Sequence, residues 1–425
     1  MTPATVAGRV EIDLSVYNPF DVESVRDPYP SVERLLADYP VAFHKDLNAW
    51  LVSPHDLVAE ILRDPRYSTR FADWKDAPAP KAEAEWNLYD KLQSLALPVV
   101  APAEHMRLRR LTAPAFSRRV MDRIEERIRD AVVGIFDEIE NPAEFNVATE
   151  IAAKVPIRAI ARMVGVPPEA ETLFEHGLGW NLVRAQNPMY AAQDRQRYIE
   201  GTLPGLQYLL DIVAERRAAA GVAGTDDADA DFIGTLLATE IDGERLTDWE
   251  IVTLITALVT AGADTAVDLH TTVIRALLLH PDQRAILRAR PELTEGAILE
   301  VLRWSGHGKF GGFPRFPLED IEVGGQLLEK GSFVMPMFAP AWLDPAKWPE
   351  PRRFDVTRNH AGNIIFGAGP HLCIGLNLVK AQGRLVIEEF ERRFGERAEI
   401  VGDVEYDPTH FNARRMTNLT VRTAA

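Results

Sequence analysis

The spacing of apolar residues along the chain predicts a mainly α-helical protein with small β-sheets. Over most of the 425 residues, apolar side chains recur three and four positions apart, the period of a helix with one buried face. Shorter apolar runs that end near turn residues predict a few brief strands. We expect helices at residues 32–38, 57–63, 104–110, 120–139 and 148–164, longer ones after residue 202, and strands at residues 41–43, 50–52, 321–323, 333–337 and near 419–421.

The longest predicted helix covers residues 248–280. Thr247 and Glu250 form a capping-box pattern at its start, and Pro281 cannot continue it. A helix of this length rises about 50 Å, enough to cross a whole domain. Its most apolar stretch, residues 251–263, is too short to span a bilayer and indicates a buried helix.

The middle of this helix carries residues that a plain core helix does not need. Asp264 stands in an otherwise apolar stretch, where an unpaired carboxylate has a desolvation cost. Gly262 lowers helix stability by about 1 kcal/mol relative to alanine, which suggests that a ligand uses the space of the missing side chain. For the helix taken alone, a capped or water-paired core aspartate is the better interpretation.

The composition excludes several classes of protein. With 46% hydrophobic and 26% charged residues the chain can bury a large core, and no Gly/Ser-rich or Pro-rich linker divides it, so we expect one large domain. A net charge of −16 disfavours nucleic acid as a partner and favours a small-molecule substrate. The first ten residues predict neither a signal peptide nor a membrane anchor. One cysteine allows no intrachain disulfide, which fits the cytoplasm.

The segment around Cys373, the only cysteine, changes the picture most. Residues 366–375 read F-G-A-G-P-H-L-C-I-G, and glycines at 367, 369 and 375 allow backbone conformations closed to residues with a Cβ. A flat ligand can then lie close to the main chain around the sulfur. A thiolate held in this way can ligate haem iron and favour cleavage of the dioxygen O–O bond. A lone cysteine is more often a small buried hydrophobe, but such a residue needs no flanking histidine and glycines.

At this segment the chain resembles the cytochrome P-450 family of haem-thiolate monooxygenases, in particular its soluble bacterial branch. The resemblance runs from Asp27-Pro28-Tyr29-Pro30, a phrase common before the first helix of that branch, to the apolar C-terminal strand. It implies a single domain over residues 1–425, family-like over about 20–422, with residues 1–19 as an N-terminal extension. It also implies the family fold, with haem between a long central helix and the cysteine loop.

The resemblance assigns roles to residues whose own chemistry fits them. Asp264 and Thr265 match the family's acid and alcohol for proton delivery in oxygen activation, and the two are the catalytic candidates. Haem propionates need cationic or hydrogen-bonding partners. His105 and Arg109, four apart and so on one helical face, together with Arg315 and His371, match positions that the family uses for this. The other cofactor-binding candidates are Ala261, Gly262, Phe366, Gly367, Cys373 and Gly375, with the Cys373 thiolate as the metal ligand.

Glu300 and Arg303 place opposite charges three residues apart on one helical face. Such pairs are mostly solvated and contribute little to stability, so the E-x-x-R pattern alone is weak evidence for a structural role. The pair precedes the cysteine by about seventy residues, and between them residues 351–354 resemble the family's P-x-R-F segment. The resemblance implies that Glu300, Arg303 and Arg353 form a buried network that locks the cysteine loop.

Some segments depart from the family pattern or leave it open. Ala341-Trp342-Leu343-Asp344 replaces the common Ala-Asn-Arg-Asp phrase, and Ala266 replaces a second threonine. The glycine- and aromatic-rich stretch at residues 306–313 either shapes the substrate pocket or is a turn whose phenylalanines join the core. Residues 77–85 fall where the family has a mobile distal loop, and we expect a solvated acidic loop at residues 218–231. Rough alignment suggests pocket positions at Trp86, Leu95, Trp180, Phe313 and Phe411.

These observations predict a monooxygenase that binds one haem b and inserts one oxygen atom from dioxygen into a small or medium-sized apolar organic molecule. Without a second cysteine or a dinucleotide fingerprint, electrons must come from a separate ferredoxin or flavodoxin with its NAD(P)H reductase. We expect Arg107, Arg110, Arg118 and Arg119 to form a basic patch that docks this donor. The alternatives are a peroxide-driven haem peroxygenase, a noncatalytic haem sensor or carrier, and, more remotely, a cysteine hydrolase with His371 as base.

Overall fold

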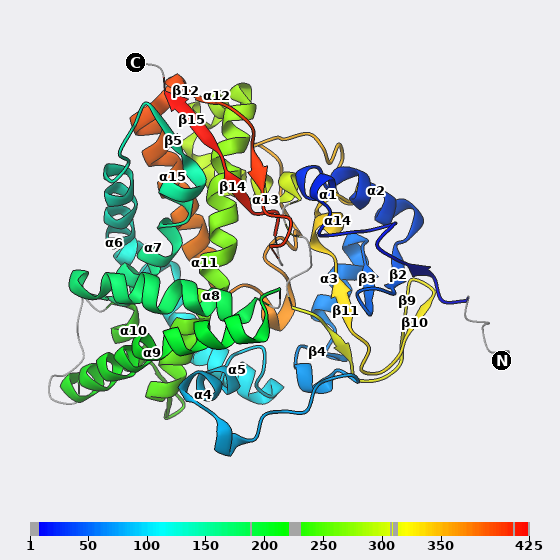
Figure 1. The fold of residues 1–425 in the computed structure, drawn as a ribbon, viewed down its shortest axis with the longest axis horizontal. Coiled ribbons are helices and arrows are strands. Elements are labelled where there is room, and N and C mark those ends of the chain that lie inside the picture. Colours follow the sequence, from blue (N-terminus) through cyan, green and yellow to red (C-terminus); the bar gives the residue numbers. More distant parts are fainter. Residues whose placement is uncertain are drawn as a thin grey trace. The chain divides into compact units, whose positions relative to one another are not determined.

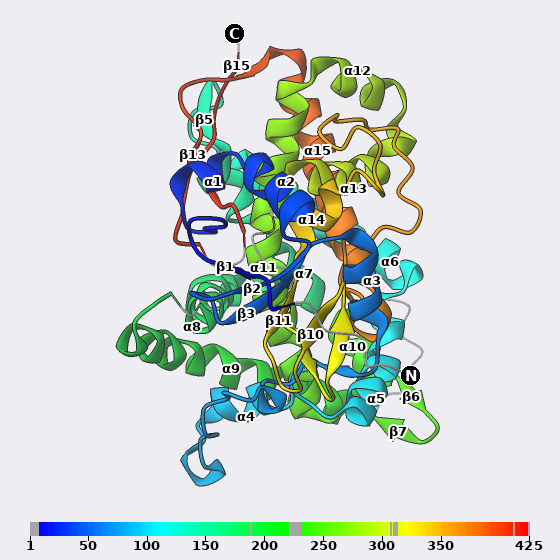
Figure 2. The same cartoon turned by 90° about the vertical axis from the view of Figure 1, so that its right-hand side faces the viewer.

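The computed structural model describes residues 8–187, 189–220, 231–306, 308, 313–410 and 413–423. Contacts group the chain into two units. The sheet unit comprises Met1–Ala79, Leu279–Cys373 and Glu405–Thr417, and the helical unit comprises Pro80–Leu278, Ile374–Val404 and Asn418–Ala425. Each unit therefore combines segments that are distant in sequence, as the colours in Figures 1 and 2 show.

A four-stranded sheet organises the sheet unit. β1 (Glu11–Ile12) pairs in parallel with β2 (Val41–His44), β2 antiparallel with β3 (Ala49–Val52), and β3 in parallel with β11 (Val334–Pro336). Figure 2 shows the yellow strand β11 beside the blue strands from the start of the chain. Apolar side chains of these strands and their neighbours form a buried cluster: Ile12, Tyr17, Leu35, Ala42, Ala49, Leu51, Met335 and Met337.

Short helices and two-stranded ladders complete the sheet unit. The helices are α1 (Val22–Arg26), α2 (Tyr29–Asp38), α3 (His55–Arg63), α12 (Pro281–Ala289), α13 (Thr294–Ser305) and α14 (Phe338–Leu343), with 3-10 turns at Phe71–Asp73, Pro291–Leu293 and Gly369–His371. The ladders pair β4 (Tyr67–Ser68) with β8 (Phe316–Pro317), β9 (Ile321–Val323) with β10 (Gln326–Leu328), and β13 (Glu405–Tyr406) with β14 (Met416–Asn418). α14 packs against α2, α3 and α13.

Helices dominate the helical unit. They are α4 (Leu88–Ser94), α5 (Pro102–Thr112), α6 (Arg118–Asp137), α7 (Val155–Val164), α8 (Trp180–Gln186), α9 (Ala192–Ala220), α10 (Phe232–Ala238), α11 (Asp248–Leu279) and α15 (Leu376–Phe394). α6 packs against α7 and α15, and α8 against α9, which lie side by side in both views of the fold.

The helical unit also contains small sheets and turns. β5 (Glu144–Asn146), β12 (Ala398–Ile400) and β15 (Thr420–Thr423) form one sheet, and β6 (Glu240–Ile241) and β7 (Glu244–Arg245) form a hairpin just before α11. Two segments are π-helical, Ala148–Ala152 and Leu173–Gly179. The 3-10 turns are Glu83–Glu85, Ala113–Phe116, Pro168–Ala170 and Gly395–Arg397.

α11 confirms the long helix that the sequence predicts. The Thr247 N–H donates to the Glu250 carboxylate at 2.7 Å and the Glu250 N–H donates to Thr247 Oγ1 at 3.2 Å, which completes the capping box. Within the described residues, α11 is the helix long and apolar enough to cross a membrane, but 67% of its most apolar window is buried, as in the core helix of a soluble protein.

The predicted helix at residues 148–164 is wrong, because the structure does not form it as one continuous α-helix. Residues 148–164 form a π-helical turn over Ala148–Ala152 followed by a separate α7, not a continuous α-helix. Pro156 explains the break, because proline lacks the N–H of a helix interior and is tolerated in the first turn of α7, where it lies. The predictions for residues 307 and 309–312, for Phe411 and for most of the acidic loop fall outside the described residues.

Candidate active site

Cys373 lies at the end of a loop that backbone hydrogen bonds close. Its N–H donates to the Phe366 carbonyl at 3.0 Å, and both residues are half-buried. Gly367 has φ +78°, a left-handed conformation that favours glycine, and a Cβ built there would meet only the His371 carbonyl, at 3.8 Å. The hydrogen bond therefore fixes the main chain at Cys373, and Gly367 leaves space beside it.

The other two glycines of the loop, Gly369 and Gly375, differ from Gly367 in what their positions require. Gly369 has φ +68°, and a Cβ there would lie 2.7 Å from the Leu62 carbonyl, so glycine lets the loop pack on the end of α3. Gly375 caps α15 with φ −82°, which any residue can adopt. Of the three glycines that allow conformations closed to other residues, Gly367 and Gly369 therefore adopt one, and Gly375 does not. The sequence could not separate these cases, because it does not show what each Cβ would meet.

Arg315 is a buried cation beside the strands of the sheet unit. It is 4% exposed, and its N–H and carbonyl both bond to Val334. Its guanidinium donates to the carbonyls of Phe313 and Pro314, and no described carboxylate pairs with it. Burial lowers the pKa of Arg315 to about 10. A buried positive charge without a carboxylate fits the role of holding an anionic group such as a haem propionate.

His105 and Arg109 lie on one face of α5, as their spacing predicts. His105 is 5% exposed, and its pKa is lowered first by burial and second by the charge of Arg109. The imidazole is therefore held in its neutral form near a guanidinium. Such a pair can offer a hydrogen bond and a charge to the same anion.

The middle of α11 is accessible although most of the helix is buried. Ala261 and Thr265 are exposed and Gly262 and Asp264 are half-buried, whereas Val267, Asp268 and Leu269 are fully buried. Thr265 Oγ1 donates to the Ala261 carbonyl at 2.8 Å.

Gly262 has no packing reason of its own in the helical unit. A Cβ there would meet Ile160 Cδ1 at 3.4 Å, an ordinary van der Waals contact, so alanine would be accommodated. This is consistent with the expectation that a ligand, not the protein, requires the missing side chain.

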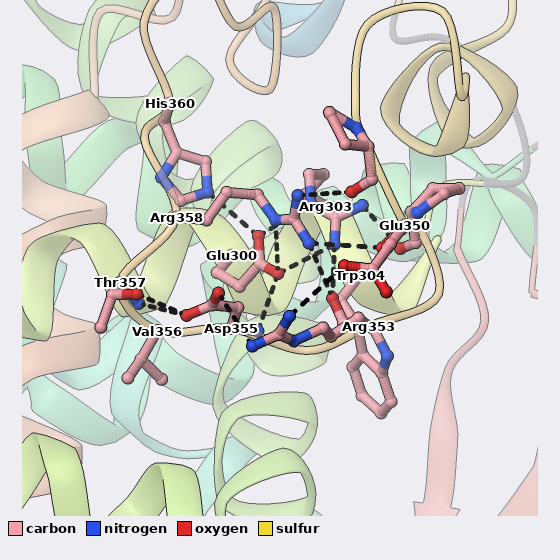
Figure 3. A network of polar contacts seen from close by, with 12 residues as sticks. Glu300, Arg303, Trp304, Glu350, Arg353, Asp355, Val356, Thr357, Arg358 and His360 are labelled. Carbon is pink, nitrogen blue, oxygen red and sulfur yellow. Dashed lines mark hydrogen bonds and ion pairs between the residues drawn. The ribbon is translucent and has the colours of Figure 1, made fainter.

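Glu300 and Arg303 of α13 form the centre of a buried network, shown in Figure 3. Both side chains are 0% exposed, and Arg303 donates to the two Glu300 oxygens at 2.7 and 2.8 Å. Arg303 also donates to the carbonyls of Trp342, Pro351 and Arg353, so one guanidinium ties α13 to α14 and to the segment after it. The E-x-x-R pair is thus buried rather than solvated.

The third cation of this network is Arg358 and not Arg353, which corrects the sequence prediction. Arg358 Nε donates to Glu300 at 3.1 Å, and His360 Nε2 lies 3.2 Å from the other carboxylate oxygen. The Arg353 side chain is 59% exposed and pairs with Glu350 and Asp355, so only its carbonyl joins the network. The prediction failed because the chain turns after Phe354 and presents the later arginine to Glu300.

The electrostatics of Glu300 follow from these partners. Burial alone would raise its pKa, but the hydrogen bonds from Arg303 and His360 and the charges of Arg303 and Arg358 outweigh burial and lower it. The carboxylate is therefore ionised, which a buried network of this kind requires.

The predicted basic patch is wrong for two of its four residues. Arg107 pairs with Glu104 and with Glu250 of α11, and Arg110 pairs with Asp242 and Glu244 of the β6–β7 hairpin, each at 2.8 Å. Three of these four acids, Glu250, Asp242 and Glu244, lie more than 130 positions away in the sequence, and only Glu104 is a near neighbour. Arg118 and Arg119 are exposed at the start of α6 and make no ion pair with a described residue.

The structure brings together some of the predicted site residues and leaves others apart. Phe366, Gly367, His371 and Cys373 share one loop, and His105 shares α5 with Arg109. Ala261, Gly262, Asp264 and Thr265 share one stretch of α11. That all of them surround one haem stays a prediction. The sequence analysis missed Arg358 and His360, for which the only signal was their position a few residues after the P-x-R-F segment.

Known proteins similar to this chain are cytochromes P450. The family model described as cytochrome P450 matches residues 205–396. The cytochrome P450 monooxygenase PikC of Streptomyces venezuelae is 31% identical over 375 residues, 86% of this chain and 84% of the relative. Vitamin D(3) 25-hydroxylase of Pseudonocardia autotrophica is 30% identical over 384 residues, 90% of this chain and 89% of the relative.

A solved structure agrees. Epothilone B-bound cytochrome P450epoK superimposes with a TM-score of 0.84 at 26% identity, covering 96% of this chain and 100% of that one. This likeness confirms the predicted fold, mainly helical with small sheets. The extent and identity of these matches show that the chain belongs to the cytochrome P450 family and is a monooxygenase.

Proposed function

We propose that the chain binds one haem b through the Cys373 thiolate and inserts one oxygen atom from dioxygen into a small or medium-sized apolar organic molecule. The observation that carries this proposal is the Cys373 loop. The sole cysteine is half-buried at the end of a loop closed by its bond to Phe366, and the backbone at Gly367 leaves room for a flat ligand. The haem supplies the iron at which dioxygen is activated.

The residues present fit a haem. Arg315 is a buried cation without a carboxylate partner among the described residues, and His105 and Arg109 offer a neutral imidazole and a guanidinium on one face of α5. With His371 of the cysteine loop, these are the residues that would hold the two propionates. Ala261 and Gly262 would let the ring lie against α11, where their small side chains leave space.

Thr265 and Asp264 would control protons. The exposed Thr265 hydroxyl already donates to the Ala261 carbonyl, so its oxygen is oriented and can hold a water molecule by accepting its hydrogen bond. Asp264, half-buried beside it, would relay protons from solvent to that water.

Relatives support the reaction class. They are named for hydroxylation or epoxidation of organic molecules, for example epothilone C/D epoxidase of Sorangium cellulosum and 6-deoxyerythronolide B hydroxylase of Saccharopolyspora erythraea. For this chain we propose oxidation of the same type. The electron donor would be a separate ferredoxin or flavodoxin with its NAD(P)H reductase, and the location cytoplasmic.

A peroxide-driven peroxygenase and a noncatalytic haem sensor or carrier are the competing functions. An accessible threonine next to an acid in the middle of α11 favours the monooxygenase, because peroxide already brings both protons and a carrier needs neither group. Turnover decides among them. Product that forms with reduced ferredoxin and dioxygen, and not with hydrogen peroxide alone, supports the monooxygenase.

The test of the haem ligand is spectroscopic. The reduced, carbon monoxide-bound protein should show the red-shifted Soret band of a thiolate haem, and Cys373→His should lose it. Leu372→Ala, a change at the exposed neighbouring residue, is the matched control and should keep the band. If Cys373→His retains the band, the axial ligand is another group and the proposal falls.

A further inference from the structure

Arg70 is an arginine of the sheet unit that has no charged partner among the described residues. It is half-buried, and its Nε is fully buried without a hydrogen-bond partner. Its terminal amino groups make no hydrogen bond or ion pair within the described residues. Leaving a buried donor unsatisfied is costly, so such a group is unusual unless a ligand completes it.

Two acids close to Arg70 in sequence have other partners. Asp73 accepts a hydrogen bond from Ser68 Oγ at 2.6 Å, and Asp64 pairs with Arg66 at 2.6 Å. Arg66 thus shows how an acid of this segment can neutralise an arginine. Arg70, four residues later, has no such acid among the described residues.

The backbone places Arg70 beside the segment that carries Arg315. β4 pairs antiparallel with β8, with Ser68 opposite Phe316, so the residues that follow β4 run next to those that precede β8. The rings of Phe71 and Phe316, each directly after one of the two arginines, lie 5.4 Å apart between centroids. Two cations without carboxylate partners among the described residues therefore come from adjoining segments.

This part of the chain also adjoins the cysteine loop. Gly369 packs against the Leu62 carbonyl and Arg63 at the end of α3, and β4 begins only a few residues further on. Arg70 thus follows the helix end on which the Cys373 loop rests.

From this arrangement we propose that Arg70 binds a carboxylate at the reaction site, either a haem propionate or an acid group of the substrate. The inference deepens the proposed function and rests on it. Arginine suits this task because its planar, permanently charged fork can donate two parallel hydrogen bonds to a carboxylate. A site that binds an acid group would also give the enzyme a preference among otherwise apolar substrates.

The experiment compares Arg70→Gln and Arg70→Leu with Arg66→Gln, a matched change at the paired arginine of the same segment. One arm measures the rate at which haem transfers from the ferric protein to excess apomyoglobin. The other titrates the ferric protein with dodecanoate and with methyl dodecanoate and follows the haem spin state. The acid and its ester differ in charge and hardly in apolar surface.

If Arg70 binds a propionate, both Arg70 variants should lose haem about tenfold faster than the Arg66 variant. Their affinities for dodecanoate and for its methyl ester should then equal those of the Arg66 variant. If it binds a substrate acid, dodecanoate affinity should fall about 10–100-fold and ester affinity should not, with haem loss unchanged. Haem loss and titrations that match those of Arg66→Gln, including no response of the parent protein to dodecanoate, overturn the proposal. Loss of the thiolate Soret band in the parent protein would instead refute the proposed function.

Discussion

Replacing Glu300 by alanine should destabilise the protein far more than replacing Arg353, the arginine that the sequence pattern favoured. Glu300 is fully buried and accepts hydrogen bonds from Arg303 and Arg358, with His360 at 3.2 Å. Glu300→Ala removes the only carboxylate among the described residues that pairs with Arg303, whose side chain is 0% exposed. A buried positive charge then stays without its counter-ion.

The magnitude follows from burial. Removing one partner of a buried ion pair costs about 3–5 kcal/mol, a large part of the roughly 5–15 kcal/mol that stabilises a folded protein. Arg353 is 59% exposed and its ion pairs with Glu350 and Asp355 are 3.3 and 3.8 Å long, so Arg353→Ala should cost about 0–1 kcal/mol. The cost of Arg358→Ala should lie between these two values. The Arg358 side chain is 12% exposed, and it donates hydrogen bonds to backbone carbonyls as well as to Glu300.

The assay is urea unfolding of the three variants and the parent, together with the haem content of the purified proteins. Glu300→Ala should give little haem-loaded protein and a much lower urea midpoint, while Arg353→Ala should match the parent. Equal midpoints for Glu300→Ala and Arg353→Ala would refute the reasoning, because the network would then contribute no more than a surface pair. A larger loss for Arg353→Ala than for Arg358→Ala would restore the original assignment.

Three further predictions address pH, oxygen activation and electron transfer. The folded-state pKa of Glu300 lies below its ordinary value of 4.5. The stability that Glu300 contributes is therefore present above pH 4.5 and is lost as the pH falls through the folded-state pKa. Over this acidic range the urea midpoint of the parent should drop more than that of Glu300→Ala. Thr265→Ala should keep consuming reduced cofactor but release hydrogen peroxide in place of product, and Asp264→Asn should slow turnover by ~10²-fold with unchanged substrate binding; wild-type product yield in both would contradict their roles. The rate of reduction by ferredoxin should fall with added salt. Arg119→Glu should lower this rate more than Arg110→Glu does, because Arg110 is already paired with two acids. Stopped-flow rates that rank the two variants in reverse would exclude this docking surface.

Local features of this protein could be predicted from its sequence. Apolar periodicity and the Thr247–Glu250 capping box define α11 to within one residue, because both signals arise from contacts within the helix itself. The spacing of Glu300 and Arg303 places them on one face of α13, and the segment around Cys373 indicates the haem chemistry of the family to which the chain belongs.

Only the tertiary structure decided which groups meet across the chain. The sequence cannot show that Arg358, and not Arg353, reaches Glu300, or that Arg110 is neutralised by the hairpin before α11. It also gives no sign that Arg66 pairs with an acid while Arg70 pairs with none in the described part of the chain. Periodicity and capping depend on residues a few positions apart, whereas the partner of a charged side chain depends on the path of loops, which long-range packing determines.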